Sequence, residues 1–385
     1  MKKKYLLLTS LALAFTLSAC GSSSSPASSS SSQPSSGSSQ GGSDTSQTSS
    51  QSPVVHGLPL PATGHYMKDA DIIQAANGDR LLVYTTNEQS GDEDNVIAIR
   101  KGVKDATDYV YGNEHIIIRP SATGWDQYLG SASITKGVFA FNGTNYSYLL
   151  AYNAGDDAEE NANSIGLAVA NDPLGTWLKV NADEPALYYD SDVYGAGMKG
   201  FYGPSLVNLD KESVVRIFYT RADAYGHFAY FVDVDASDLS AFDPSGYVMV
   251  PTNGDLTGGD DTTMIPNSDF AYDAEEEQFY MIKDYSPAAS KRPKVSTRIE
   301  LAVIDEAELY TTDVLAGWES LALYDFTDTP NLEYERLYAA TIVADEFGHL
   351  LSSEEIELVY NVSELEADNA NYLFTQKLIT LIYEA

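Results

Sequence analysis

Residues 129–180, LGSASITKGVFAFNGTNYSYLLAYNAGDDAEENANSIGLAVANDPLGTWLKV, contain the pattern that decides the fold. They predict four short strands: Ala132–Ala140, Tyr146–Tyr152, Ser164–Ala170 and Trp177–Val180. The apolar runs are separated by Asn142-Gly143 and by Asp172-Pro173-Leu174-Gly175, where glycine accepts positive φ and proline presets φ for a turn. No run keeps a helical period. The stretch is therefore expected to form one four-stranded antiparallel sheet.

The second strand of this unit recurs along the chain. The matching segments are Leu81–Tyr84, Leu149–Tyr152, Arg216–Tyr219, Phe279–Ile282 and Glu357–Tyr360, whose ends are 68, 67, 63 and 78 residues apart. A repeat of this length that contains only strands is typical of sheets arranged radially. We predict an all-β fold, a five-bladed β-propeller of four-stranded antiparallel blades. A two-sheet sandwich is the alternative, but it would not require so regular a repeat.

The N-terminus has the features of a bacterial lipoprotein leader. Three lysines after Met1 precede the apolar run Leu6–Leu17, which is too short to cross a bilayer. The following Leu17-Ser18-Ala19-Cys20 resembles the lipobox, which implies cleavage before Cys20 and lipidation of its thiol. Because Cys20 is the only cysteine, neither a disulfide nor a cysteine metal site is expected.

These features predict the organisation of the chain and its location. We expect a signal peptide over residues 1–19, a lipidated Ser-rich disordered tether over 20–53 and the propeller over 54–385. The blades are expected at about 68–118, 129–180, 201–251, 263–324 and 334–385. The predicted location is the bacterial cell envelope, at the outer membrane or cell surface. The lipid anchor is the only expected membrane contact.

The charge of the chain limits its partners. It has 22 Lys+Arg against 56 Asp+Glu, a net charge of −34, and such a surface repels nucleic acids and other anions. Neutral sugars, cationic ligands and divalent cations are compatible with it. The five histidines have no metal-ligand spacing, so no metal site or cofactor is expected, although the channel of a propeller could hold a cation such as calcium.

In a propeller, the first strand of each blade lines the central channel. The repeat assigns this position to Lys68–Ile73, Gly130–Ile134, Tyr202–Leu206, Pro266–Phe270 and Tyr338–Ile342. Small and polar residues precede an apolar residue in each segment. Ser133 and Ser205 are candidate substrate-binding residues on these segments, although crowding near the axis also explains small side chains there.

Three segments resemble family 43 glycoside hydrolases and their five-bladed relatives. Ile165–Ala170 followed by Asp172–Trp177 is similar to the family's run G-x-A-x-S-x-x-P-x-G-P-W, and Lys68–Ile73 resembles its R-D-P-D-I-I. Gly203–Leu206 also resembles the family's sequence pattern in the third blade. The resemblance implies cleavage of arabinosides, xylosides or galactosides with inversion. It also implies three carboxyl groups: a base, a group that tunes pKa, and an acid.

The resemblance carries the role of base to Asp69. Gly203 stands where the tuning aspartate is usual, and Pro266-Asn267-Ser268 lacks the usual acid. Inversion needs an acid and a base roughly 6.5–9.5 Å apart with water between them. Asp71 and Asp269 share one register and form an alternative acid/base pair, provided that one of them is protonated. Otherwise these aspartates cap strand ends or bind a cation or water.

Aromatic side chains are the other candidates for sugar binding. Trp125, Tyr128, Tyr194, Phe201 and Tyr202 precede or begin the inner strands of blades two and three, and aromatic faces stack on sugar rings. The alternative is that they pack between blades.

Three functional hypotheses remain open at this stage. The leading one is an envelope lipoprotein that binds an oligo- or polysaccharide in its central pocket, with hydrolysis left undecided by the two unmatched carboxyl groups. The second is an active glycosidase that uses a shifted acid/base pair. The third is a protein-interaction scaffold of the envelope.

Overall fold

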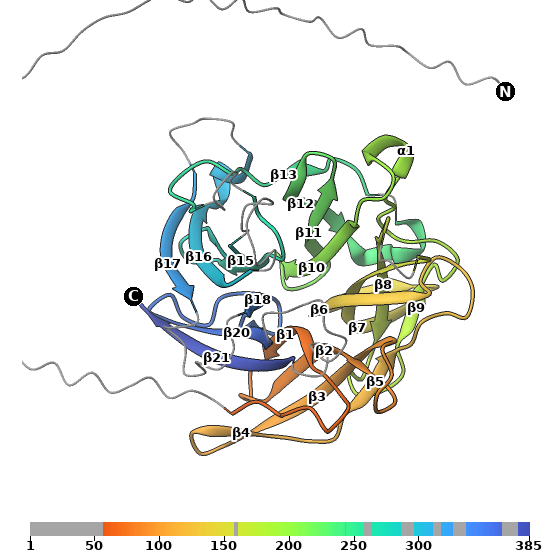
Figure 1. Ribbon diagram of the computed structural model, residues 1–385, viewed down its shortest axis with the longest axis horizontal. Coiled ribbons are helices and arrows are strands. Elements are labelled where there is room, and N and C mark those ends of the chain that lie inside the picture. The colour runs from red at the N-terminus through yellow and green to blue at the C-terminus, as the bar shows by residue number, and fades with distance from the viewer. Residues whose placement is uncertain are drawn as a thin grey trace, which may run out of the picture. The chain divides into compact units, whose positions relative to one another are not determined.

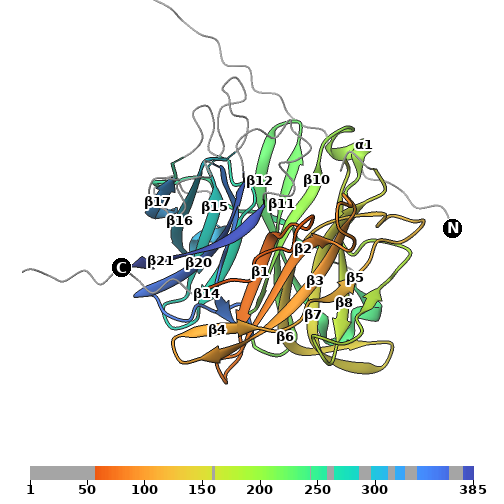
Figure 2. The same ribbon diagram turned by 60° about the horizontal axis from the view of Figure 1, so that its bottom comes forward.

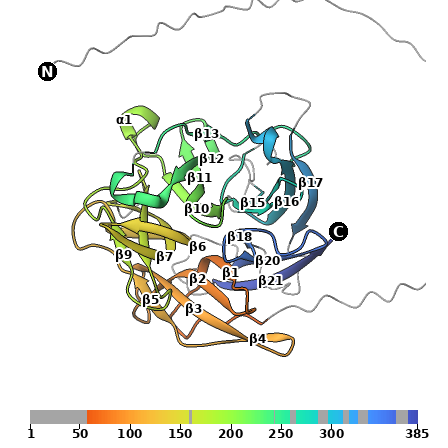
Figure 3. The ribbon, with the colours of Figure 1, turned by 180° about the vertical axis from the view of Figure 1, so that it is seen from behind.

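The computed structural model describes residues 57–157, 161–242, 244–257, 264–285, 296–310, 317–325, 336–363 and 376–385. The predicted leader and the whole of the predicted tether, with Cys20, lie outside these residues. The described chain is almost entirely strand, in five sheets arranged around a central axis (Figures 1 and 3). The predicted five-bladed β-propeller is confirmed.

The five sheets follow one another along the chain. The first contains β1 (Lys68–Gln74), β2 (Arg80–Asn87), β3 (Asn95–Asp105), β4 (Asp108–Tyr111) and β5 (His115–Ile118). The second contains β6 (Tyr128–Phe141), β7 (Thr144–Gly155), β8 (Ser164–Ala170) and β9 (Leu178–Val180). The third contains β10 (Gly200–Asn208), β11 (Val214–Asp223), β12 (Gly226–Asp235) and β13 (Val248–Met249).

The last two sheets complete the ring. The fourth contains β14 (Asp269–Asp273), β15 (Gln278–Asp284), β16 (Arg298–Asp305) and β17 (Glu319–Asp325). The fifth contains β18 (Arg336–Ile342), β20 (Glu355–Ser363) and β21 (Lys377–Glu384). Among the described residues, helical structure is limited to α1 (Ser191–Tyr194), at the edge of the ring (Figures 1 and 2), and to 3-10 turns at Ala236–Ala241 and Glu306–Tyr310. No helix in the described ranges is long and apolar enough to cross a membrane.

The turns of the second sheet form where the sequence predicts them. Asn142 and Gly143 have φ of 51° and 74° and join β6 to β7, as a two-residue hairpin turn requires. Asp172 accepts the backbone N–H of Leu174 at 3.0 Å, and its carbonyl accepts that of Gly175 at 2.9 Å. Local side-chain and backbone chemistry is therefore enough to set these reversals.

Apolar side chains on both faces of each sheet hold the ring together. Successive strand residues point to opposite faces. In β7, Leu150 packs with Val83 and Ile97 of the first sheet, whereas its neighbour Leu149 packs with Ile217 of the third. Each sheet is thus covered on both sides by its neighbours, which explains why β2 and β8 are buried along their whole length.

The first and last sheets meet through backbone hydrogen bonds. The short strand β19 (Ala344–Asp345) follows β18 and pairs in parallel with β1, with Ile73 opposite Ala344. The N–H of Met67 donates to the carbonyl of Gln376 at 3.3 Å. Residues from the start of the described chain thereby close the ring against its last sheet.

Candidate functional site

The inner strands depart from regular pairing at one common depth. The register shifts between Lys68 and Asp71 in β1, Leu129 and Ala132 in β6, Tyr202 and Ser205 in β10, and Tyr338 and Thr341 in β18. Asp69, Gly203, Asn267 and Ala339 have φ of 51°, 59°, 45° and 44°. β-Bulges bend a strand and redirect a side chain, so this repeated irregularity shapes the wall around the axis.

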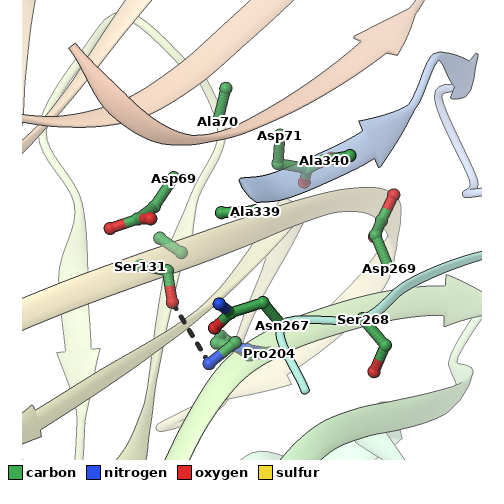
Figure 4. A pocket seen from close by; sticks show the side chains of 12 residues that line it. Asp69, Ala70, Asp71, Ser131, Pro204, Asn267, Ser268, Asp269, Ala339 and Ala340 are labelled. Carbon is green, nitrogen blue, oxygen red and sulfur yellow. Dashed lines mark hydrogen bonds between the residues drawn. The ribbon is translucent and has the colours of Figure 1, made fainter. Parts of the chain in front are cut away.

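Two adjacent cavities lie at these bulges. The inner cavity is lined from all five blades, by Asp69, Ala70, Asp71, Ser131, Ala132, Gly203, Pro204, Asn267, Ser268, Asp269, Ala339 and Ala340 (Figure 4). The outer cavity, of about 180 Å³, is lined by Lys68, Asp69, Gly130, Ser131, Asn153, Lys199, Tyr202, Asn267, Arg336, Tyr338 and Gln376. Asp69, Ser131 and Asn267 line both, so they mark the boundary between the two cavities.

Asp69, the predicted base, is held in place through its backbone. Its N–H donates to Oδ1 of Asn361 at 2.9 Å, and Nδ2 of Asn361 donates to the carbonyl of Met67 at 3.1 Å. Asn361 is fully buried. A non-glycine residue in the left-handed region persists only where its surroundings hold it there. The amide of Asn361 does so, and the carboxylate of Asp69 remains at the cavity wall (Figure 4).

One step deeper, polar side chains link the inner strands of successive blades, from β1 through β6, β10 and β14 to β18. We call Asp71, Ser133, Ser205, Asp269 and Thr341 the inner polar ring. Ile134 N–H donates to Asp71 Oδ2 at 2.7 Å, Leu206 N–H to Ser133 Oγ at 3.0 Å, Phe270 N–H to Ser205 Oγ at 3.0 Å, and Ile342 N–H to Asp269 Oδ2 at 2.8 Å. Ser133 and Ser205, predicted to bind substrate, are buried and act here as acceptors between blades.

The structure brings Asp71 and Asp269 close enough for their charges to interact. Burial, together with the nearby charge of Asp269, raises the pKa of Asp71 to about 7. Burial also raises the pKa of Asp269. Two buried carboxyl groups in one site do not ionise together easily, so the pair retains a proton near neutral pH.

Asp284 is a buried carboxyl group that the sequence analysis missed. It ends β15, accepts Asn267 Nδ2 at 2.6 Å on Oδ2, and accepts the N–H of Ala339 at 2.7 Å on Oδ1. Asp284 therefore positions two residues of the inner cavity wall. Burial raises its pKa to about 7, and the charge of Asp69 contributes to the increase. Its one sequence signal is an acidic residue directly after an apolar strand, which is also typical of an ordinary strand end.

The predicted aromatic residues lie in three environments: the cavity, the packed interior and the surface. Tyr202 lines the outer cavity, and its hydroxyl hydrogen-bonds to Nδ1 of His227 at 2.6 Å. Trp125 stacks on Tyr152 with ring centroids 5.8 Å apart, while Phe201 is buried and packs against Tyr194. Tyr128 lies exposed at the start of β6. Of these five candidates, Tyr202 alone is among the residues that line the two cavities.

Other outer-cavity residues were also missed. Tyr338 donates its hydroxyl hydrogen to Oε1 of Gln376, and both side chains line the cavity with Lys199 and Arg336. Across the described ranges, no group of three or more His, Cys, Asp or Glu side chains is placed to hold a metal ion. A cation in the channel stays a prediction.

Comparison with known proteins places this fold among carbohydrate-active proteins. No protein-family model and no curated protein matches the sequence. Solved structures do match. The α-L-arabinofuranosidase PaAbf62A from Podospora anserina, in complex with cellotriose, is 12% identical with a TM-score of 0.52, covering 86% of this chain and 96% of its own.

Two further structures match over similar lengths. Zg3597, a family 117 glycoside hydrolase produced by the marine bacterium Zobellia galactanivorans, is 12% identical with a TM-score of 0.53, covering 86% of this chain and 88% of its own. An N-acetylgalactosamine deacetylase from F. plautii, in complex with blood group B trisaccharide, is 15% identical with a TM-score of 0.52, covering 86% and 94%.

The fold is that of propeller glycoside hydrolases. At these identities the likeness concerns the fold alone, because one fold can support different reactions. The deacetylase among these structures illustrates that point. The chemistry of this chain depends on the side chains that line its own cavities.

Proposed function

We propose that the protein binds an oligo- or polysaccharide in its central cavities. The observation that carries this proposal is the position of Asp69, whose carboxylate lies where the two cavities meet, beside Ser131 and Asn267. Carboxylate, hydroxyl and amide groups together accept from and donate to sugar hydroxyls. The glycoside hydrolases among the structural neighbours support the same ligand class.

The cavity argues for binding without cleavage. An inverting glycosidase needs an acid facing its base across the sugar. Asp69 can serve as the base, but Gly203 and the segment Pro266-Asn267-Ser268 provide no carboxyl group at the positions that the family resemblance assigns. Asp284 has the raised pKa of an acid, yet both of its oxygens accept hydrogen bonds from the cavity wall.

A glycosidase with a shifted acid/base pair is the second candidate, favoured by the raised pKa of Asp71 and Asp269. Both groups line the inner cavity. However, each also accepts a backbone hydrogen bond from the next blade. In a catalytic role, Asp71 and Asp269 would have to act on a sugar while also accepting the hydrogen bonds that link the blades.

One experiment separates these functions. The purified protein and its Asp69→Asn variant are titrated with arabinan, xylan and galactan oligosaccharides, and the products are analysed. Binding without released sugar supports the proposal, with affinity expected to fall about tenfold in the variant through loss of a charged hydrogen bond. Release that disappears in Asp69→Asn supports the glycosidase. Failure to bind any glycan, together with a co-purifying protein, would favour the scaffold.

We also propose that the protein is anchored in the cell envelope through Cys20. The lipobox-like Leu17-Ser18-Ala19-Cys20 supports this location. Metabolic labelling with a radioactive fatty acid should mark the protein, and Cys20→Ala should abolish both the label and membrane retention. An unlabelled wild-type protein would contradict the anchor.

A further inference from the structure

The outer cavity gathers positive charge in a strongly acidic protein. Lys68 begins β1, Lys199 precedes β10, and Arg336 begins β18, so the three cations come from the first, third and fifth blades. All three line the outer cavity. The chain has 22 cationic residues and 56 acidic ones, so three cations at one cavity are unusual for a protein of this composition.

Each cation lies over the face of a tyrosine. Arg336 Cζ is 3.9 Å from the ring centroid of Tyr338, and Lys199 Nζ is 4.6 Å from that of Tyr202. Lys68 Nζ is 5.8 Å from the ring of Tyr66. Cation–π contacts attract a charge to the ring face. The same arrangement at three blades holds the positive groups at the cavity rather than leaving them to move freely in solvent.

The tyrosines are themselves fixed. The hydroxyl of Tyr202 hydrogen-bonds to Nδ1 of His227, and that of Tyr66 donates to Oδ1 of Asn95, both at 2.6 Å. Tyr66, Tyr202 and Tyr338 are all buried. The positive groups therefore contact tyrosine rings that are themselves held in place, as a preorganised binding site requires.

The local charge balance favours an anion. Among the described residues that line the outer cavity, three are cations and one, Asp69, is a carboxylate. Asp284 lies behind the wall, with a pKa raised by burial to about 7, so it carries only part of a negative charge near neutral pH. More distant acids are screened at physiological salt, where the Debye length is about 8 Å. Repulsion by the whole surface thus acts on large polyanions, whereas a single charged group in the cavity meets the cations first.

We propose that the outer cavity binds a sugar carrying an anionic group, either a uronate carboxylate or a sulfate ester. This inference rests on the proposed binding of carbohydrate and specifies its class. A planar guanidinium such as that of Arg336 can donate two parallel hydrogen bonds to an oxyanion, and each lysine can add a point charge. A neutral sugar would use only the weaker bonds from these groups to hydroxyl oxygens.

The test compares matched ligands on the purified protein by titration calorimetry. A uronate-containing oligosaccharide is paired with the same compound after reduction of its carboxylates, and a sulfated galactan oligosaccharide with its desulfated form. If the uronate compound binds more tightly than its reduced form, the anionic group is a carboxylate. If the sulfated compound binds more tightly than its desulfated form, the anionic group is a sulfate ester. We expect the charged member of one pair to bind at least tenfold more tightly, and this preference to shrink at high salt.

Variants connect the preference to the cavity. Arg336→Gln, Lys68→Gln and Lys199→Gln should each weaken binding of the charged ligand about tenfold, with little effect on its neutral partner. Lys199→Arg should retain most of the affinity. Lys104→Gln removes an exposed charge that lies outside both cavities, and it is the matched control, expected to have no effect. Circular dichroism and thermal melting confirm that each variant is folded.

The outcomes are separable. Equal affinity within both ligand pairs, unchanged by Arg336→Gln, would overturn the inference and leave carbohydrate binding intact. Absence of binding to every charged and neutral oligosaccharide by folded protein would overturn both.

Discussion

Replacing Asn361 tests how the fold presents Asp69. Asn361→Ala removes the acceptor of the Asp69 N–H at 2.9 Å and the donor to the Met67 carbonyl at 3.1 Å. A buried backbone group left without a partner costs about 1–3 kcal/mol. The Asp69 N–H is only partly buried, so its cost should be near the low end of this range. Together with the Met67 carbonyl, we expect a loss of about 2–4 kcal/mol in the free energy of unfolding.

Urea unfolding followed by two spectroscopic probes measures this loss, since coincident transitions justify a two-state analysis. Asn145→Ala is the control, because Asn145 is exposed in β7, and it should change stability by less than about 0.5 kcal/mol. Glycan affinity should fall as well, because the Asp69 carboxylate loses its fixed position. A loss below about 1 kcal/mol with unchanged affinity would refute the view that Asn361 holds this bulge.

Three further predictions concern the interior. Ser205→Ala removes the acceptor of the Phe270 N–H in the inner polar ring and should cost about 1–3 kcal/mol by urea unfolding. Lys283 and Glu300 form a fully buried ion pair at 2.8 Å, so Lys283→Met, which leaves the Glu300 carboxylate without its cation, should cost about 3–5 kcal/mol by urea unfolding. Because burial raises the pKa of Asp71 to about 7, the folded state binds a proton that the unfolded state has lost, so stability should fall as the pH rises from about 4 to 7. A melting temperature that stays level over this range, or an equal fall in Asp71→Asn, would contradict this prediction.

The fold could be predicted from the sequence because its signals are local. Asn142-Gly143 and Asp172–Gly175 set turns through their own backbone preferences, and the tyrosine-ended strands repeat with a nearly constant spacing. Each sheet also has apolar residues on both faces, because each packs between two neighbours. These features predict the number of blades and the strand that lines the axis.

The cavity could be predicted only in part. Asp69 was found through the resemblance of its segment, and it lies at the cavity wall. The sequence predicts Trp125 and Phe201 as sugar-stacking aromatics, whereas they pack within the protein against Tyr152 and Tyr194. In the sequence, an aromatic residue near an inner strand looks the same whether it stacks on a sugar or packs between blades. The burial of its two faces depends on strands far away in the chain.

Local sequence patterns are enough to predict a ring of five sheets and the segments that line its axis, because turns, strand alternation and repeated strand patterns can be recognised without knowing which blades meet. The tertiary structure alone decided which side chains meet at the axis. Lys68, Lys199 and Arg336 come from three blades, and no rule of spacing relates them. Asp284 contacts Asn267 and Ala339 because the fourth and fifth blades meet at the axis, and a shift of one residue in a strand turns a side chain to the opposite face.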